Sequence, residues 1–147
     1  MRIRILAALL GTLCLPSQAF EIFDGYTLSK DVINVSYIRV KPNKVDEYLE
    51  GILQSWVASC ELQKKLGTVK ACQVLLANNL SHRGFNLILG TRTASAALSD
   101  PDEKMYKEFN VQWRKILEEG KQKKLVEGYE LIREFYDESN YREITFK

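Results

Sequence analysis

The stretch that decides the fold reads VINVSYIRVKPNKVDEYLEGIL and spans residues 32–53. Its first nine residues alternate between two faces, which predicts a β-strand from Val32 to Val40. Lys41-Pro42-Asn43 ends that strand, and asparagine is a residue type that caps helix N-termini. From Val45 onward apolar residues recur every three or four positions, so we predict an amphipathic helix that ends near Leu66.

The middle of the chain predicts two more strands and a second helix. Short apolar runs at residues 71–77 and 85–91, with turn-forming residues between them, predict antiparallel strands joined by a loop. The sequence Asp100-Pro101-Asp102-Glu103 predicts a helix start. In this interpretation Asp100 is the cap, proline takes the first helical position and Glu103 completes a capping box.

The order of all elements predicts an α+β fold. Leu125, Tyr129, Ile132 and Tyr136 have helical spacing, which predicts a further helix over residues 121–136, before a closing strand at 141–147. The result is a ferredoxin-like βαββαβ pattern with an extra C-terminal helix before the last strand.

The turn Lys41-Pro42-Asn43-Lys44 and the helix start at residues 100–103 resemble those of the dimeric α+β barrel superfamily. Its members include antibiotic-biosynthesis monooxygenases and stress-responsive barrel proteins. Asn43 stands where this family commonly has glycine. The resemblance covers residues 32–147 and implies a dimeric α+β barrel, but its short motifs do not specify an activity.

The first residues have the pattern of a secretory signal peptide. Arg2 and Arg4 precede an apolar run from Ile5 to Leu15, and the pattern predicts cleavage after Ala19. A membrane-spanning helix needs about 20 apolar residues, so we expect no stable membrane anchor. The expected layout is a signal peptide at 1–19, an N-terminal arm at 20–31 and a barrel domain at 32–147, in an exported protein that is periplasmic or secreted.

Charge argues against two classes of partner. Cleavage removes two arginines that account for the formal net charge of +2, so the mature chain is neutral. A neutral chain lacks the overall field with which proteins attract nucleic acid or an anionic membrane. We therefore expect neither as a partner.

The cysteines and the single histidine limit the metal chemistry. Cys60 and Cys72 remain after cleavage, and in an oxidising compartment this pair is a candidate disulfide; the alternative is that both are small buried hydrophobes. His82 falls in a loop, and a lone histidine offers too few ligands for a Cys/His metal site. We expect no metal and no cofactor.

An open sheet face predicts a homodimer. Helices cover one face of a four-stranded sheet, and the other face needs a partner when it is apolar. We predict that this open face carries Ile38, Val40, Val74, Leu76 and Ile88. Packing two such sheets together buries these side chains, and in the family that the chain resembles such dimers enclose cavities for small organic molecules.

Five residues are candidates for ligand contact. We predict that Asn34, Ser36, Asn86 and Arg92 point away from the helices. Ordinary hydrogen bonds at the sheet interface are the favoured role, and the alternative is that they line a polar ligand pocket between the sheets. Trp113 lies at core spacing on its helix, so packing is its expected role and ligand contact the alternative.

Three functions remain open at this level. The leading hypothesis is an exported homodimer that binds a small apolar or aromatic molecule. The second is a cofactor-independent monooxygenase or isomerase, in which Asn86, Arg92 or Trp113 holds an oxidisable substrate. The third is a structural or interaction protein whose arm docks elsewhere. Haem-degrading members of the superfamily use a histidine on the second helix, and residues 102–119 contain none.

Overall fold

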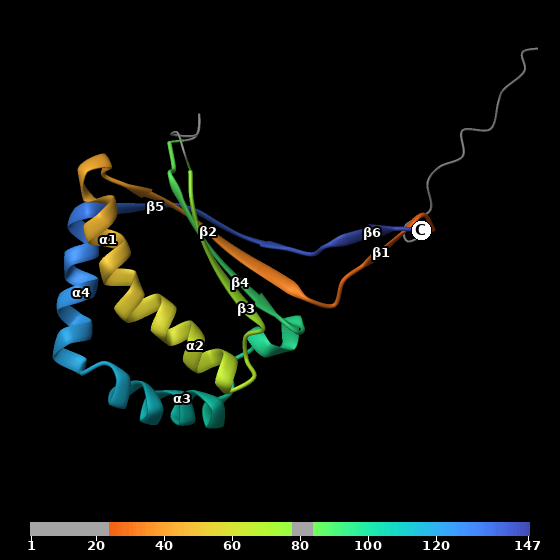
Figure 1. The fold of residues 1–147 in the computed structure, drawn as a ribbon. Coiled ribbons are helices and arrows are strands. Elements are labelled where there is room, and N and C mark those ends of the chain that lie inside the picture. Colours follow the sequence, from red (N-terminus) through yellow and green to blue (C-terminus); the bar gives the residue numbers. More distant parts are fainter. Residues whose placement is uncertain (1–23, 78–83) are drawn as a thin grey trace, which may run out of the picture.

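A computed structural model of the protein describes residues 24–77 and 84–147. The expected signal peptide, its cleavage site and His82 lie outside the described residues. The body is a four-stranded antiparallel sheet with the strand order β3-β4-β2-β5 (Figure 1). Its strands are β2 (Val32–Val40), β3 (Ala71–Leu76), β4 (Leu87–Thr93) and β5 (Arg133–Tyr141). This order, with helices between β2 and β3 and between β4 and β5, is ferredoxin-like, which confirms the predicted fold class.

A single helical run connects β2 to β3, as predicted. It consists of η1 (Pro42–Lys44), α1 (Val45–Ile52), the π-helical segment η2 (Leu53–Val57) and α2 (Ala58–Lys65). The predicted capping role of Asn43 is wrong, because a 3-10 turn occupies this position and no side chain caps α1. Asp46 and Glu47 do lie in the first turn, where they complement the helix dipole.

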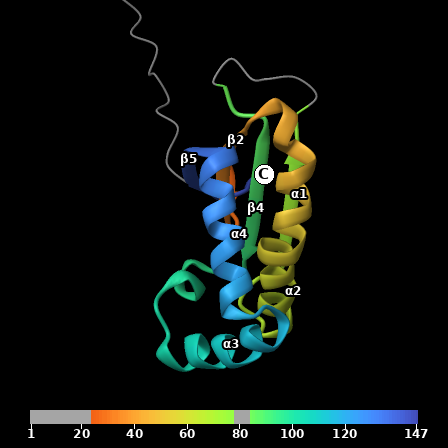
Figure 2. The ribbon, with the colours of Figure 1, turned by 90° about the vertical axis from the view of Figure 1, so that its left-hand side faces the viewer.

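Two helices connect β4 to β5, α3 (Glu103–Ile116) and α4 (Glu119–Ile132), after a short 3-10 turn η3 (Ala96–Ser99). The cap of α3 is Asp102 rather than Asp100, since the Asp102 side chain accepts a hydrogen bond from the Met105 backbone N–H. Figure 2 shows α4 beside α1 and α2, with α3 across their lower ends. The predicted extra helix is therefore present, and it is α4 that lies beside α1 over the sheet.

The last part of the chain corrects the predicted boundaries. The helix ends at Ile132, and residues 133–141 form β5 along the whole of β2, followed by β6 (Ile144–Phe146). The prediction extended the helix to Tyr136 because this aromatic residue continues the helical spacing. The register of β2 and β5 shifts between Tyr37 and Ile38, so β5 carries an irregularity at this point.

The core lies between the sheet and the helices, and it overturns the predicted faces of β2. Ile38 and Val40 are buried in one cluster with residues of the helices: Tyr48, Ile52, Tyr129 and Ile132. Val74 packs against the same cluster, and Leu76 shares its face by pairing with Leu87. These four apolar side chains therefore face the helices, and of the five predicted for the open face only Ile88 lies there.

The open face of the sheet nevertheless carries apolar residues, together with polar ones such as Arg92 and Asp137. Tyr37, Ile88 and Leu75 lie side by side across three strands, with Val35 and Ile33 farther along β2 on the same face. Leu75 is 52% exposed. Tyr37 also contacts Phe85, at 4.8 Å between ring centroids, and shares a hydrogen bond of 2.9 Å with the Tyr141 hydroxyl.

A two-stranded arm extends from the sheet. Its strands are β1 (Tyr26–Leu28) and β6, which pair antiparallel, and Figure 1 shows them projecting beyond the ends of β2 and β5. Ile144 and Phe146 are exposed on it. Among the described residues, no helix combines the length and the apolar content that crossing a membrane requires.

Candidate functional site

A cleft of about 490 Å³ lies between the sheet and the helices within one chain. Its floor is formed by Ser36, Leu89 and Phe135 of three neighbouring strands. Its walls come from η2, α2, α3 and α4. The lining includes six aromatic side chains, Trp56, Tyr106, Phe109, Trp113, Tyr129 and Phe135.

The cleft begins where the core ends along β2. Ile38 and Val40 are apolar and covered by helices, whereas Ser36, two residues earlier on the same face, is a small polar residue on the cleft floor. A serine side chain fills less space than an apolar core side chain, and its hydroxyl group can be exposed to solvent on the floor of the cleft. The π-helical turn η2 lies opposite and contributes Ser55 and Trp56, and such turns occur frequently at functional sites.

Stacked aromatic rings form one wall. The Trp113 ring lies 5.8 Å from the Phe109 ring at an interplanar angle of 15°. The Trp113 indole N–H donates to the Gln122 side-chain oxygen at 3.0 Å, which holds α3 to α4. Trp113 is buried with Leu62 and Leu117 in a small core cluster, and it also lines the cleft. Its side chain therefore has both the packing role and a place on the cleft wall.

A pair of hydroxyl groups closes the core end of the cleft. Tyr129 of α4 and Ser55 of η2 lie 2.7 Å apart, and the Ser55 hydroxyl also donates to the Gly51 carbonyl at 3.0 Å. Gly51 is required here, because a Cβ on it would lie 2.6 Å from the Tyr129 ring. Close approach of α4 to α1 therefore depends on a residue without a side chain.

Of the described residues that line the cleft, Arg133 alone is charged. Its guanidinium donates to the Tyr48 hydroxyl at 2.8 Å and lies over the rings of Tyr129 and Phe135, at 4.9 and 4.5 Å from their centroids. Burial raises the pKa of Tyr48, an effect that Arg133 partly opposes. Among the described residues, no carboxylate lies within 4 Å of this guanidinium.

A second groove of about 730 Å³ adjoins the cleft between α2 and the start of α3. Ser59, Tyr106 and Phe109 line both hollows, and the groove adds Leu66, Leu98 and Met105 with a rim of acids. The acids have local partners: Asp102 caps α3, and Glu103 forms an ion pair with Lys107. The groove thus extends the apolar surface of the cleft toward solvent.

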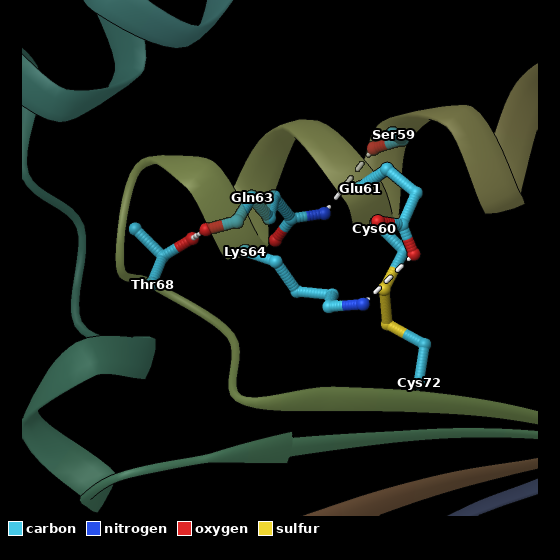
Figure 3. The surroundings of a disulfide bond; sticks show 7 residues. All are labelled: Ser59, Cys60, Glu61, Gln63, Lys64, Thr68 and Cys72. Carbon is cyan, nitrogen blue, oxygen red and sulfur yellow. Dashed lines mark hydrogen bonds and ion pairs between the residues drawn. A yellow bond between two sulfur atoms is a disulfide. The ribbon is translucent and has the colours of Figure 1, made fainter.

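A disulfide holds α2 to β3 beside the cleft. It joins Cys60 to Cys72 across a Cα separation of 6.4 Å (Figure 3). Glu61 and Lys64 of α2 form an ion pair. Cys60 directly follows Ser59 of the cleft lining. The prediction required Cα atoms within about 7 Å, and the structure has that geometry.

The five predicted ligand residues lie in different places. Ser36 and Trp113 meet in the cleft. Asn34 pairs with Thr91, which pairs with Cys72, and the disulfide of Cys72 points to α2. Asn34 and Ser36 therefore face the helices, and the prediction that they point away is wrong. The prediction put Asn34 and Ser36 on the open face because they are polar. The residue pattern of a strand does not show that a cleft lies on its helix-covered face. The Asn34 amide donates to Glu138 at 2.7 Å and to Asn140 at 3.3 Å.

Asn86 is a buried residue directly before the inner strand β4, and it is not part of the cleft lining. Its amide oxygen accepts from the Val40 N–H at 2.8 Å, and its amide nitrogen donates to the Val40 carbonyl at 3.0 Å. Both atoms thus continue the backbone pairing of β2, and the prediction that Asn86 points away from the helices into a pocket is wrong.

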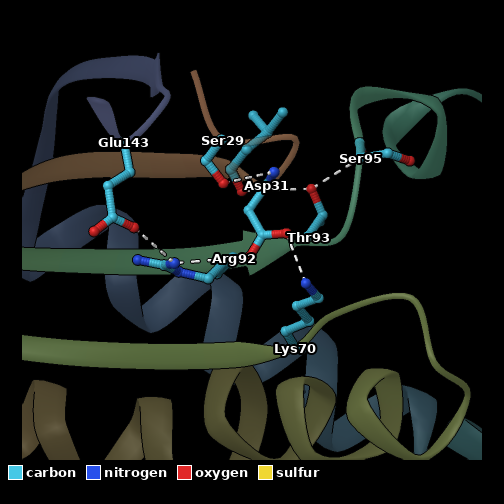
Figure 4. Close-up of polar contacts among 8 residues, drawn as sticks. Ser29, Asp31, Lys70, Arg92, Thr93, Ser95 and Glu143 are labelled. Atoms are coloured by element: carbon cyan, nitrogen blue, oxygen red, sulfur yellow. Dashed lines mark hydrogen bonds and ion pairs between the residues drawn. The ribbon is translucent and has the colours of Figure 1, made fainter. Parts of the chain in front are cut away.

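Arg92 lies on the open face, at the base of the arm. Its guanidinium is 3.3 Å from the Glu143 carboxylate and 3.7 Å from that of Asp31 (Figure 4). Asp31 also accepts from Lys70 at 2.6 Å, and this hydrogen bond is the main cause that lowers the pKa of Asp31. Arg92 therefore joins β4 to the arm.

Sequence reasoning missed Arg133, Ser55 and Tyr129. The prediction has Arg133 inside a helix, whereas it is the first residue of β5, an edge strand that pairs with β2. Tyr129 has core spacing, and nothing local distinguishes a core tyrosine from one whose hydroxyl reaches a serine 74 residues away. Within the described part of the chain, no group of three or more His, Cys, Asp or Glu residues is arranged to hold a metal ion.

No protein-family model and no curated protein matches the chain. Among solved structures, HapK from Hahella chejuensis matches with 14% identity and a TM-score of 0.47, over 76% of this chain and 91% of that one. A dimeric ferredoxin-like protein from an uncultured marine organism matches with 8% identity and a TM-score of 0.43, over 81% and 90% of the two chains. A dimeric protein of unknown function and ferredoxin-like fold from Bacteroides fragilis matches with 12% identity and a TM-score of 0.41, over 82% and 100%.

Proposed function

We propose that the protein binds a small, largely aromatic molecule in the cleft between its sheet and helices. The observation that carries this proposal is the cleft lining, in which six aromatic rings surround a few polar groups from serine, asparagine and glutamine. A volume of about 490 Å³ lies in the range of small-molecule sites, and such sites combine apolar walls with a few polar groups. The expected ligand is a flat molecule of two or three rings.

The lining supports binding more than acid–base catalysis. Among the described residues, the lining contains no aspartate, glutamate, histidine or cysteine, which are the usual proton-transfer groups and nucleophiles. The Ser55 and Tyr129 hydroxyls form a hydrogen bond with each other, and the described cleft lining offers no proton-transfer group to activate them. A monooxygenase or isomerase activity therefore has less support than binding.

A neutral fluorescent probe tests the proposal directly. N-phenyl-1-naphthylamine has three aromatic rings in total and no charge, and Trp56 and Trp113 in the lining are donors for energy transfer to it. We expect saturable binding to the mature protein with its cysteines oxidised. Ser36→Phe fills the floor of the cleft, so we expect at least tenfold weaker binding.

Thr27→Phe is the matched control, since it makes the same kind of change at an exposed position of β1, away from the cleft. It should bind the probe as the wild type does. Equal binding by Ser36→Phe and the wild type, or no saturable binding at all, would overturn the proposal.

We also propose that two chains associate through the open sheet face. Its support is the row of Tyr37, Ile88 and Leu75, together with the exposed apolar residues of the arm. Val35→Glu introduces a charge into the middle of this face and should convert a dimer to a monomer in native mass spectrometry. Leu53→Glu, at a residue that is 63% exposed on the helical side, should leave the dimer intact. A wild-type monomer would refute this association.

We propose export on the sequence pattern of residues 1–19 alone. Export would bring the cysteine pair into an oxidising compartment, in which disulfides persist. Intact-mass measurement of the protein from its native host is the test: the expected N-terminus is Phe20, and a chain that retains residues 1–19 would contradict the proposal.

A further inference from the structure

We propose that the ligand is an aromatic carboxylate and that Arg133 binds its carboxylate group. This inference rests on the proposed binding function and names the chemical class of its ligand. It starts from the charges around the cleft. Arg133 is the single charged residue of the lining, and the ion pairs of the described residues do not include it.

The glutamates on and next to β5 do not neutralise the charge of Arg133 within the cleft. Glu138 shares a face of β5 with Arg133 by register, but its carboxylate accepts from Asn34 and is not part of the lining. Glu130 and Glu134 line a separate outer hollow that Arg133 also borders. That hollow holds Arg39 and Lys41 as well, so its two acids face two bases besides Arg133.

The guanidinium is held in place by its surroundings. One N–H group donates to Tyr48, whose side chain is fully buried, and the rings of Tyr48, Tyr129 and Phe135 lie within 5.6 Å of its central carbon. A guanidinium has five N–H donors, and the contact with Tyr48 uses one of its nitrogens. The remaining donors suit a carboxylate, which arginine binds through two parallel hydrogen bonds.

The rest of the lining selects the body of the ligand. Trp113 and Phe109 offer a stacked aromatic wall, and Phe135 places a ring next to the guanidinium itself. An aromatic carboxylate matches both features at once, with its rings against the wall and its charge at Arg133. A purely structural role for Arg133, as a cation held between aromatic rings, is the alternative that the experiment must separate.

The experiment compares 2-naphthoate with 2-naphthamide by calorimetry on the mature, oxidised protein at pH 7. The two probes have the same shape and differ in charge. We expect naphthoate to bind at least tenfold more tightly than naphthamide. In Arg133→Met this preference should disappear while the affinity for naphthamide stays within about twofold, because the neutral amide does not form the charge-assisted pair with the guanidinium. Arg133→Lys should retain part of the preference.

Arg92→Met is the matched control. It removes one positive charge outside the cleft, so the preference for naphthoate should persist, and its loss would indicate a general electrostatic effect instead of a site. The comparison of the two probes on the wild type needs no variant, so it decides the question even where Arg133→Met does not fold.

The outcomes separate the two proposals. Binding of N-phenyl-1-naphthylamine that Ser36→Phe abolishes, combined with equal affinities for naphthoate and naphthamide, would overturn the carboxylate inference and leave the binding function standing. A preference that survives in Arg133→Met would assign Arg133 the structural role. Failure of all three probes to bind would remove the binding function itself.

Discussion

The two ends of one sheet face are built differently. At the Val40 end, Ile38, Leu87 and Tyr48 form a closed core between β2, β4 and α1. Only on the edge strand β5 does the cleft reach this end, through Arg133 and Phe135. At the Asn34 end, the same face of the same strand carries Ser36, and the helices opposite contribute aromatic walls instead of a core. A change from apolar to small polar side chains along one face therefore turns a packed interface into a cleft.

Different forces hold the helices at the two ends. Apolar burial holds α1 and α4 to the sheet at the core end, where it contributes about 25 cal/mol per Å² of buried apolar surface. At the cleft end Cys60 and Cys72 attach α2 to β3 covalently, at the level of Asn34 in the register. A covalent bond keeps the wall in place without filling the space that a ligand needs.

Removing a core side chain should have the largest effect. Leu87 is fully buried, so Leu87→Ala is expected to lower the free energy of unfolding by about 2–5 kcal/mol. Phe135 lies in the cleft and is 56% exposed, and Phe135→Ala should cost less than about 1 kcal/mol. Urea denaturation at one protein concentration measures both. Similar losses in the two variants would mean that core and cleft are not distinct.

Removing the disulfide should come next. The two cysteines are 12 residues apart, and a loop of this size predicts a loss of about 3 kcal/mol in the double variant Cys60→Ala with Cys72→Ala. Probe binding should weaken as well, because α2 carries Ser59 of the cleft. A reductant should reproduce the loss in the wild type and leave the double variant unchanged; a wild type insensitive to reductant would show that the bond is absent or unimportant.

The close approach of α1 and α4 provides a third test. Gly51→Ala places a methyl group against the Tyr129 ring and should cost about 1–3 kcal/mol by overpacking. In Gly128→Ala, a Cβ meets no atom within 4 Å, so that variant should be more stable by roughly 0.5–1 kcal/mol. Thermal unfolding of the pair gives the signs. A tolerated Gly51→Ala would mean that the helices are not held together at Tyr129.

The smallest effect concerns the ionisation of Tyr48 in the core. Burial raises its pKa above the ordinary value of 10.0, so the folded protein retains this proton at a pH at which the unfolded chain has lost it. The resulting stability is present below pH 10.0 and declines as the pH rises toward the folded pKa. Tyr48→Phe lacks this decline. Unfolding free energies of both proteins between about pH 8 and 11 should diverge only at the alkaline end, and parallel curves would contradict the assignment.

The sequence predicted most elements because their signals are local. Lys41-Pro42 ends a strand wherever it occurs, and the acidic residues near Asp102 mark a helix start within one turn. The end of α4 was missed because Tyr136 fits a helical period by chance, while β5 is a strand through its pairing with β2, about 100 residues away. Of the residues that line the cleft, Ser36 and Trp113 are among the predicted ligand contacts, Ser36 with its face predicted wrongly, and Arg133 is not among them.

The sequence by itself determined the order of the elements, the ferredoxin-like topology and the spacing of the cysteine pair, since alternation, helical periodicity and capping residues act over a few positions. Only the tertiary structure decided which face of β2 the helices cover. Both faces carry apolar residues, Ile33 and Val35 on one and Ile38 and Val40 on the other, so local pattern cannot choose between them. In the tertiary structure the helices pack on Ile38 and Val40, and the same packing brings Arg133, Tyr129 and Ser36 to one cleft.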